Sequence, residues 1–179
     1  GIVGYAYTYS NAPNRPEIFY CTNNGEVTVD GGGVYVGGIV GYSYHRIQYA
    51  MTPIKWCLNT GNITGKQNVS GILGYLRGYN SQPRTDLWNC ENRGNILAQD
   101  QNAGGILGGC YNPITRVGVG VLMDNCLNTG NVQYANETQG TPNVGGIAGL
   151  FTGGQLRNSY TCGKVGLLEG TESESAAAT

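Results

Sequence analysis

The heptapeptide Cys57-Leu58-Asn59-Thr60-Gly61-Asn62-Ile63 decides the fold, because the chain repeats it at regular intervals. Successive copies are 36, 33 and 36 residues apart, and the others are Cys21–Val27, Cys90–Ile96 and Cys126–Val132. A weaker fifth copy, Ser159–Val165, follows 33 residues later with serine in place of cysteine and threonine in place of asparagine. A period in this range indicates a solenoid, a propeller or an array of repeats.

A second motif recurs between the copies of the first. This glycine motif reads Gly-Gly-Ile, then a small or apolar residue, then Gly, with serine in the first position of one copy. Its copies are Gly37–Gly41, Ser70–Gly74, Gly104–Gly108 and Gly145–Gly149. The opening Gly1-Ile2-Val3-Gly4 matches the end of an earlier copy. We therefore expect the chain to begin inside a repeat and to be part of a longer protein.

The composition favours strands and turns over helices. The chain of 179 residues has 31 glycines and 12% charged residues, against about 25% charged residues in ordinary globular domains. Asn, Thr, Val, Ile and Tyr are plentiful, which is typical of strands and turns. No segment carries apolar residues at helical spacing for three turns, and none approaches the roughly 18 apolar residues of a membrane span. We expect an all-β segment that does not insert into a membrane.

Alternation within the heptapeptide predicts how the repeats stack. Cys57, Asn59, Gly61 and Ile63 fall at every second position, so in an extended strand they share one face. Stacking equivalent strands in register buries that face, which one repeat cannot do alone. We predict a right-handed parallel β-solenoid (β-helix) of four to five turns, built from 33–41-residue repeats over residues 1–165, with 166–179 as a polar tail.

Stacking in register predicts two columns of identical side chains. Asparagines should form an amide ladder, as they do in other stacked strands, and the motif glycines should form tight corners at positive φ. We expect the four in-register cysteines to form a buried thiol stack that acts as small hydrophobic residues; a disulfide involving Cys110 is the alternative. The chain has no closely spaced Cys or His pairs, so it predicts no metal site. The ladder residues are Asn23, Asn59, Asn92, Asn128, Cys21, Cys57, Cys90 and Cys126.

The paired motifs resemble a known repeat. The stretches NCENRGNI…AGGILG and CLNTGNV…NVGGIAG are similar to the GLUG repeat of bacterial secreted and surface proteins, including the amino-terminal regions of some IgA-cleaving metallopeptidases. The resemblance covers residues 1 to about 165 and implies an extracellular or cell-surface location, without implying an activity. The zinc signature of such peptidases needs two histidines and a glutamate on a helix, whereas the only histidine here is His45.

The segments that follow the glycine motifs predict a binding face. These segments, 5–20, 42–56, 75–89, 109–125 and 150–158, hold ten of the 13 tyrosines and seven of the ten basic residues, with only three acidic ones. Insertions in a solenoid emerge along one side, often the binding side. Tyrosine and arginine on that side would suit an acidic glycan or a glycoprotein. The candidate ligand-binding residues are Tyr42, Tyr44, Arg46, Tyr75, Arg77, Tyr79, Arg84, Tyr111 and Arg116.

Other interpretations compete with glycan binding. Tyr5, Tyr42 and Tyr75, the first aromatic residues after each corner, can instead stack on their neighbours as packing. A structural stalk, or copies that associate end to end through open strand edges, would need no ligand. A polysaccharide-cleaving β-helix would need paired carboxylates, for which Asp86, Glu91 and Asp124 are the candidates. The net charge of −1 disfavours nucleic acid. We expect a non-catalytic adhesion or spacer module without a cofactor.

Overall fold

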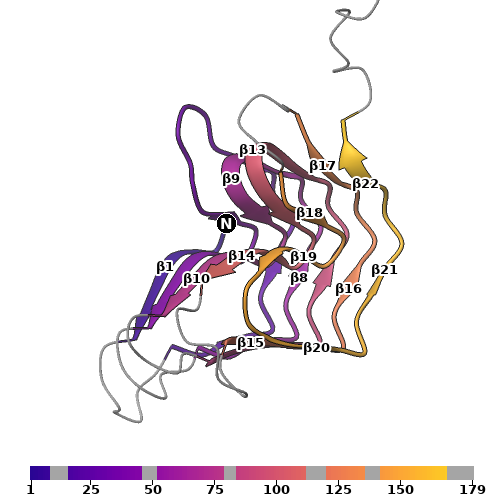
Figure 1. Ribbon diagram of the computed structural model, residues 1–179. Helices are drawn as coiled ribbons and strands as arrows, with labels where there is room; N and C mark the ends of the chain where they lie inside the picture. Colours follow the sequence, from indigo (N-terminus) through magenta and orange to yellow (C-terminus); the bar gives the residue numbers. More distant parts are fainter. Residues whose placement is uncertain (9–15, 46–51, 79–83, 112–119, 136–141, 169–179) are drawn as a thin grey trace, which may run out of the picture.

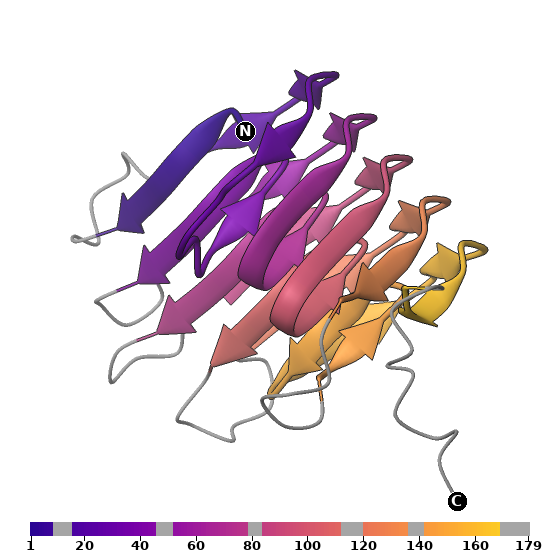
Figure 2. The same ribbon diagram turned by 90° about the horizontal axis from the view of Figure 1, so that it is seen from above.

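The protein is an all-β parallel solenoid of about four turns. A computed structural model describes residues 1–8, 16–45, 52–78, 84–111, 120–135 and 142–168. These residues form strands and no helix, and their strand pairs are parallel. Figure 1 shows the corresponding strands of successive turns aligned behind one another, and Figure 2 shows the turns side by side in chain order.

Each turn contributes one strand to each of four sheets, which we call A, B, C and D in chain order. The strands of sheet A are β1 (Val3–Thr8), β6 (Val40–His45), β10 (Leu73–Gly78), β14 (Leu107–Tyr111) and β19 (Ala148–Phe151). The strands of sheet B are β2 (Ile18–Phe19), β7 (Ile54–Lys55), β11 (Arg84–Trp88), β15 (Gly120–Asp124) and β20 (Gly154–Arg157).

Sheets C and D are formed by the heptapeptides and the residues that follow them. The strands of sheet C are β3 (Thr22–Asn23), β8 (Leu58–Asn59), β12 (Glu91–Asn92), β16 (Leu127–Asn128) and β21 (Tyr160–Thr161). The strands of sheet D are β4 (Val27–Thr28), β9 (Ile63–Ser70), β13 (Ile96–Gly104), β17 (Val132–Tyr134) and β22 (Val165–Leu167), joined by β5 (Val36–Gly37) and β18 (Val144–Gly145), which pair with β9 and β13.

The predicted register of the heptapeptides is confirmed. Asn59 pairs with Asn23 of the turn before and with Asn92 of the turn after, and Asn92 pairs with Asn128. Cys57, Asn59, Gly61 and Ile63 are buried, whereas the residues between them are exposed or half-buried. The heptapeptide is not one extended strand, however, because a corner at residues 60–62 divides it between sheets C and D.

The amide ladder is a continuous chain of hydrogen bonds through the interior. Each amide Nδ2 donates to the Oδ1 of the asparagine in the next turn at 2.7 Å, from Asn23 to Asn59, Asn92 and Asn128 in succession. At its end, Asn128 donates to Thr161 Oγ1 at 3.2 Å. Each Nδ2 also donates to the carbonyl oxygen of the heptapeptide glycine two residues on, which satisfies both amide protons.

The second residue of the glycine motif must be glycine because the asparagine side chains of the amide ladder pack against it. An added Cβ at Gly71 would overlap the side-chain amide of Asn92, and one at Gly38 would overlap that of Asn59. The ladder therefore spans the interior from sheet C to the corner before sheet A. It separates a larger apolar core between sheets A, B and C from a smaller one inside sheet D.

The prediction that the motif glycines lie at positive φ is wrong for both the heptapeptide and the glycine motif. Gly61 has no positive φ; it is required because a Cβ there would overlap the carbonyl oxygen of Gly25 in the turn before. Positive φ occurs instead at the residue before each cysteine position, for example 53° at Trp56 and 53° at Asn89. Asparagine tolerates this conformation better than most other residues.

All six cysteines are free thiols. In the predicted thiol stack, each buried Sγ donates a hydrogen bond to a backbone carbonyl oxygen of sheet B in the turn before. The pairs are Cys57 to Ile18, Cys90 to Ile54 and Cys126 to Leu87. Hydrogen bonding with the thiols of Cys126 and Cys57, together with burial, raises the pKa of Cys90 well above its ordinary value. Burial also raises the pKa of Cys110. Both thiols are therefore protonated at neutral pH.

A second amide ladder, which the sequence analysis did not identify, lines the corner between sheets D and A. Asn143 donates to Asn102 Oδ1 and Asn102 donates to Asn68 Oδ1, each at 2.8 Å. Asn68 in turn donates to the carbonyl oxygen of Val34 at 2.9 Å. Each asparagine lies three residues before the second residue of its glycine motif, so the repeated spacing was visible in the sequence.

The last described turn differs from the earlier turns at Leu156 and extends beyond the expected end of the solenoid. Leu156 occupies the position of the fully buried residues Ile54, Leu87 and Met123, yet it is 49% exposed because no later described turn covers it. The solenoid also continues past residue 165, since β22 ends at Leu167 and the backbone N–H of Leu168 donates to Tyr134. No helix in the described ranges has the length and apolar character to cross a membrane.

A polar cluster is buried where sheets A and B diverge. His45 is fully buried on β6, and its Nε2 lies 3.2 Å from Ser43 Oγ and 3.0 Å from Thr52 Oγ1. Thr52 Oγ1 also lies 3.3 Å from Thr8 Oγ1. The Nδ1 of His45 has no hydrogen-bond partner among the described residues. Burial lowers the pKa of His45 from 6.5 to about 4, so the ring is neutral at neutral pH.

Replacing Asn92 with alanine should destabilise the fold strongly. The change removes hydrogen bonds to Asn128 and Gly94 and leaves buried polar groups without partners, which costs at least about 3 kcal/mol of unfolding free energy. Chemical denaturation followed by circular dichroism measures this. The matched control is Asn24→Ala, which removes an exposed amide that accepts from Thr60 and should change stability by less than about 0.5 kcal/mol. Equal effects of the two substitutions would contradict a central role for the ladder.

Stability should fall as the pH drops from 6.5 towards 4. The depressed folded pKa of His45 means that the neutral ring stabilises the fold above pH 6.5 and that this contribution is lost as pH falls to about 4. The loss amounts to about 3 kcal/mol. Thermal denaturation across this range should show a shallower pH dependence in His45→Gln, and because His45 is the only histidine, no other imidazole obscures the comparison. An unchanged slope would contradict the buried neutral state.

Candidate binding surfaces

The outer face of sheet A carries two columns of aromatic residues in register. In the first column Tyr5 pairs with Tyr42 and Tyr42 with Tyr75. The strands alternate in and out, so the neighbouring outward positions form a second column two residues further on. This second column is Tyr7, Tyr44, Arg77 and Tyr111.

The rings of these columns stack on one another. The ring centroids of Tyr5 and Tyr42 lie 5.2 Å apart, and those of Tyr7 and Tyr44 lie 5.6 Å apart. Tyr35, from the segment before sheet A, stacks on Tyr42 at 4.6 Å and on Tyr75 at 4.9 Å. The stacking predicted for Tyr5, Tyr42 and Tyr75 is therefore confirmed.

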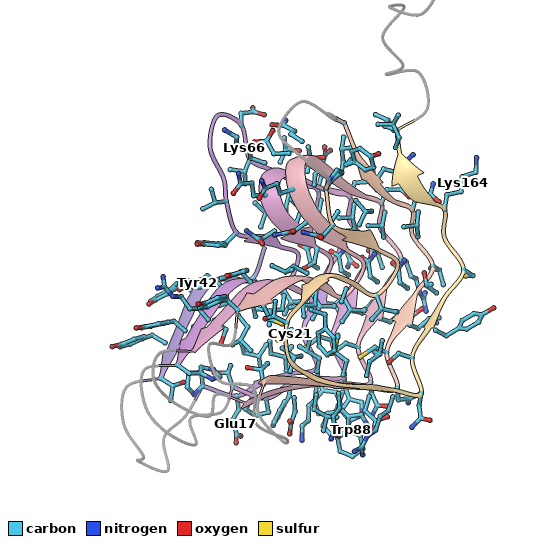
Figure 3. The ribbon with its side chains drawn as sticks, in the orientation of Figure 1. Glu17, Cys21, Tyr42, Lys66, Trp88 and Lys164 are labelled. Carbon is cyan, nitrogen blue, oxygen red and sulfur yellow. The ribbon has the colours of Figure 1, made fainter. Side chains whose placement is uncertain are left out.

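Stacking leaves much of this surface accessible to solvent. Tyr5 is 54% exposed, Tyr7 is 38% exposed and Tyr111 is 49% exposed, and Arg77 is exposed among them. Figure 3 shows Tyr42 on the outside of sheet A. We call this surface the tyrosine face and define it as Tyr5, Tyr7, Tyr35, Tyr42, Tyr44, Tyr75, Arg77 and Tyr111.

The hydroxyl groups of Tyr42 and Tyr75 stay protonated over the physiological range. Burial, followed by the neighbouring Tyr35, raises the pKa of Tyr75 to about 12. Burial also raises the pKa of Tyr42, although the adjacent Arg77 guanidinium opposes the shift. These two residues thus present neutral hydroxyl groups, with the positive charge of Arg77 beside them.

The first column ends without leaving a hollow. Its next position is Gly109, and the Tyr75 ring lies over it, because a Cβ built at Gly109 would be 3.2 Å from Tyr75 Cδ2. The same Cβ would be 2.7 Å from Asn68 Oδ1. The Tyr75 ring therefore fills the end of the first column.

The structure brings together five of the nine predicted ligand-binding residues. Tyr42, Tyr44, Tyr75, Arg77 and Tyr111 all belong to the tyrosine face. Arg84 is elsewhere, at the start of β11 in sheet B. Arg46, Tyr79 and Arg116 lie outside the described residues. The long segments are divided between sheets A and B, so their described residues contribute to two surfaces rather than to one side.

The second surface was not predicted from the sequence. Tyr20, at the corner between sheets B and C, stacks on Trp56 with centroids 4.9 Å apart and planes 6° apart. Trp88 lies 5.9 Å from Trp56. We call these three residues the tryptophan stack. The signal available was an aromatic residue directly before Cys21 and before Cys57, and one two residues before Cys90.

The three candidate acids for polysaccharide cleavage are separated into two places. Glu91 forms an ion pair with Arg93, with Oε1 and Nε 2.6 Å apart. Asp86 and Asp124 both line a hollow on the outer face of sheet B. Within the described ranges, no group of three or more His, Cys, Asp or Glu side chains is arranged to hold a metal ion.

Comparisons with known proteins do not place the chain in a family. No protein-family model, curated protein or solved structure matches the chain.

Proposed function

We propose that the chain is a non-catalytic adhesion module of an extracellular or bacterial surface protein, and that it binds acidic glycans or glycoproteins through the tyrosine face. The observation that carries the proposal is an array of stacked yet exposed tyrosines beside Arg77. The extracellular location rests on the resemblance to GLUG repeats.

The stacked arrangement is suited to binding because the rings are already positioned. Each tyrosine is held by a neighbour in the next turn, so binding immobilises few side chains and costs less conformational entropy. Tyrosine offers an apolar ring and a hydroxyl in one rigid side chain, as in other protein-recognition surfaces. Packing and ligand contact are therefore compatible roles for the same residues.

Arg77 supports an acidic rather than a neutral ligand. Its guanidinium is exposed between Tyr44 and Tyr111 in the second column, where it can pair with a carboxylate or sulfate in a two-point contact. None of the residues that form the tyrosine face is acidic. Regular spacing along the solenoid would also let successive sugar units contact successive turns, which favours an extended chain over a small molecule.

A glycan array probed with the purified chain tests this proposal. We expect binding to acidic glycans that weakens between low and physiological salt, because exposed charge pairs are screened. The double variant Tyr44→Ala/Arg77→Ala should weaken binding by roughly tenfold or more, given the loss of one charge-assisted hydrogen bond and one ring contact.

The matched control removes the same residue types from another surface. Tyr160→Ala/Lys164→Ala deletes one tyrosine and one basic residue on the side of sheets C and D, where Tyr160 is 65% exposed. This variant should bind acidic glycans as well as the unmodified chain. Absence of acidic-glycan binding by folded protein, or equal losses in both double variants, would refute the assignment to the tyrosine face.

A structural spacer that associates end to end is the second candidate. The last described turn presents apolar residues that earlier turns bury or half-bury: Leu156 is 49% exposed and Val165 is 46% exposed. Its strands β20, β21 and β22 each have a strand partner on one side only, and such edges can pair with another copy.

Sedimentation of the chain over a range of concentrations separates this candidate from adhesion. A spacer predicts concentration-dependent assembly that Val165→Lys reduces, because a charge would be buried at the junction between copies. The exposed substitution Val34→Lys, at a surface loop before sheet A, is the control. A monomer at all concentrations would exclude association through this end.

A further inference from the structure

The tryptophan stack ends in the middle of the solenoid. Tyr20, Trp56 and Trp88 come from three successive turns, and Figure 3 shows Trp88 projecting outward from sheet B. In the next turn the residue paired with Trp88 is Asp124, and the corner residue that follows is Asn125. No ring continues the stack there, and Trp88 remains 43% exposed.

A hollow lies beside Trp88 on the outer face of sheet B. Its volume is 210 Å³ and it is lined by Lys55, Asp86, Trp88, Leu122 and Asp124. At about 30 Å³ for each water molecule, this is space for roughly seven waters, which suits a single small ring rather than a large ligand.

The lining combines an aromatic ring, an apolar side chain and charges of both signs. Lys55 Nζ lies 5.0 Å from the centroid of Trp88. Asp124 Oδ1 accepts a hydrogen bond from Asn158 Nδ2 at 2.9 Å. A carboxylate accepts about four hydrogen bonds, so Asp124 retains capacity for further donors. Leu122 sits beside Asp124 and supplies an apolar surface.

These charges select the class of ligand. A cation entering the hollow would meet Lys55, which already lies over Trp88. An anion would meet the carboxylates of Asp86 and Asp124. A neutral ligand with an apolar face and several hydroxyl donors avoids both repulsions, and it can use the ring and the carboxylates together. A neutral sugar ring has this chemistry.

We propose that the hollow is a second binding site, for one ring of a neutral saccharide. The sugar ring stacks against Trp88, and its hydroxyls donate to Asp124 and Asp86. The site lies on sheet B, away from the tyrosine face on sheet A, and it goes beyond the proposed recognition of acidic glycans. Its binding should be nearly independent of salt because the ligand carries no charge.

Intrinsic fluorescence provides a direct test. The chain has two tryptophans, so Trp56→Phe keeps an aromatic ring in the stack and leaves Trp88 as the only indole reporter. The probes are linear hexasaccharides of glucose, mannose and N-acetylglucosamine, titrated at low and physiological salt. We expect a saturable change in Trp88 emission with at least one of them, and affinities at the two salt concentrations that agree within roughly twofold.

Variants locate the binding to the hollow. Asp124→Asn in the same background should lower the affinity by roughly tenfold, the loss of one hydrogen bond to a charged group, whereas Asp30→Asn, an exposed acid elsewhere, should leave it unchanged. Trp88→Leu, followed by isothermal calorimetry, should abolish binding while circular dichroism shows the solenoid intact. Tyr44→Ala/Arg77→Ala should retain neutral-saccharide binding, which separates this site from the tyrosine face.

Three results would overturn the proposal. The first is the absence of a saturable change with all three hexasaccharides in folded protein. The second is binding that survives both Asp124→Asn and Trp88→Leu. The third is a preference for an arginine-rich peptide, with an affinity that falls with salt, which would make the hollow a cation site instead.

Discussion

The amide ladder of Asn23, Asn59, Asn92 and Asn128 is the constraint on which the rest of the structure depends. It crosses the interior as a line of 2.7 Å hydrogen bonds and divides the apolar core in two. A buried amide is tolerated only when its donors and acceptors are satisfied. Only one register between turns satisfies them, so the ladder fixes how every turn lies on the next, and it also forces glycine into the facing corner.

Because the register between turns is fixed, residues at equivalent positions of successive repeats form columns on the surface. Once Asn59 lies over Asn23, every residue between the motifs is placed over a residue of the neighbouring turn, including those with no structural requirement. Tyr5, Tyr42 and Tyr75 become one stacked column in this way, and Tyr20 and Trp56 become another. A change of residue type along a column then creates a local feature, such as the hollow beside Trp88.

The two aromatic surfaces differ in charge. The tyrosine face carries the positive charge of Arg77, whereas the hollow on sheet B is lined by two carboxylates and one lysine. Both surfaces repeat at the spacing of the turns or end at a defined turn, which suits polymers of sugar units. A module that contacts acidic and neutral saccharides on different sides could hold two kinds of glycan together.

The sequence by itself determined the parallel solenoid, its period and the asparagine and cysteine ladders of the heptapeptide, because a residue type that recurs at fixed spacing needs no knowledge of distant contacts to be recognised. It also indicated the tyrosines of sheet A. Only the tertiary structure decided that a turn has four sides, that the heptapeptide bends at residues 60–62, and that the heptapeptide glycine serves close stacking rather than positive φ. The hollow also depended on it, because Lys55, Asp86 and Asp124 come from three turns. The corners between the sheets determine which residues of a turn lie next to one another. These corners arise from packing between turns rather than from any local pattern.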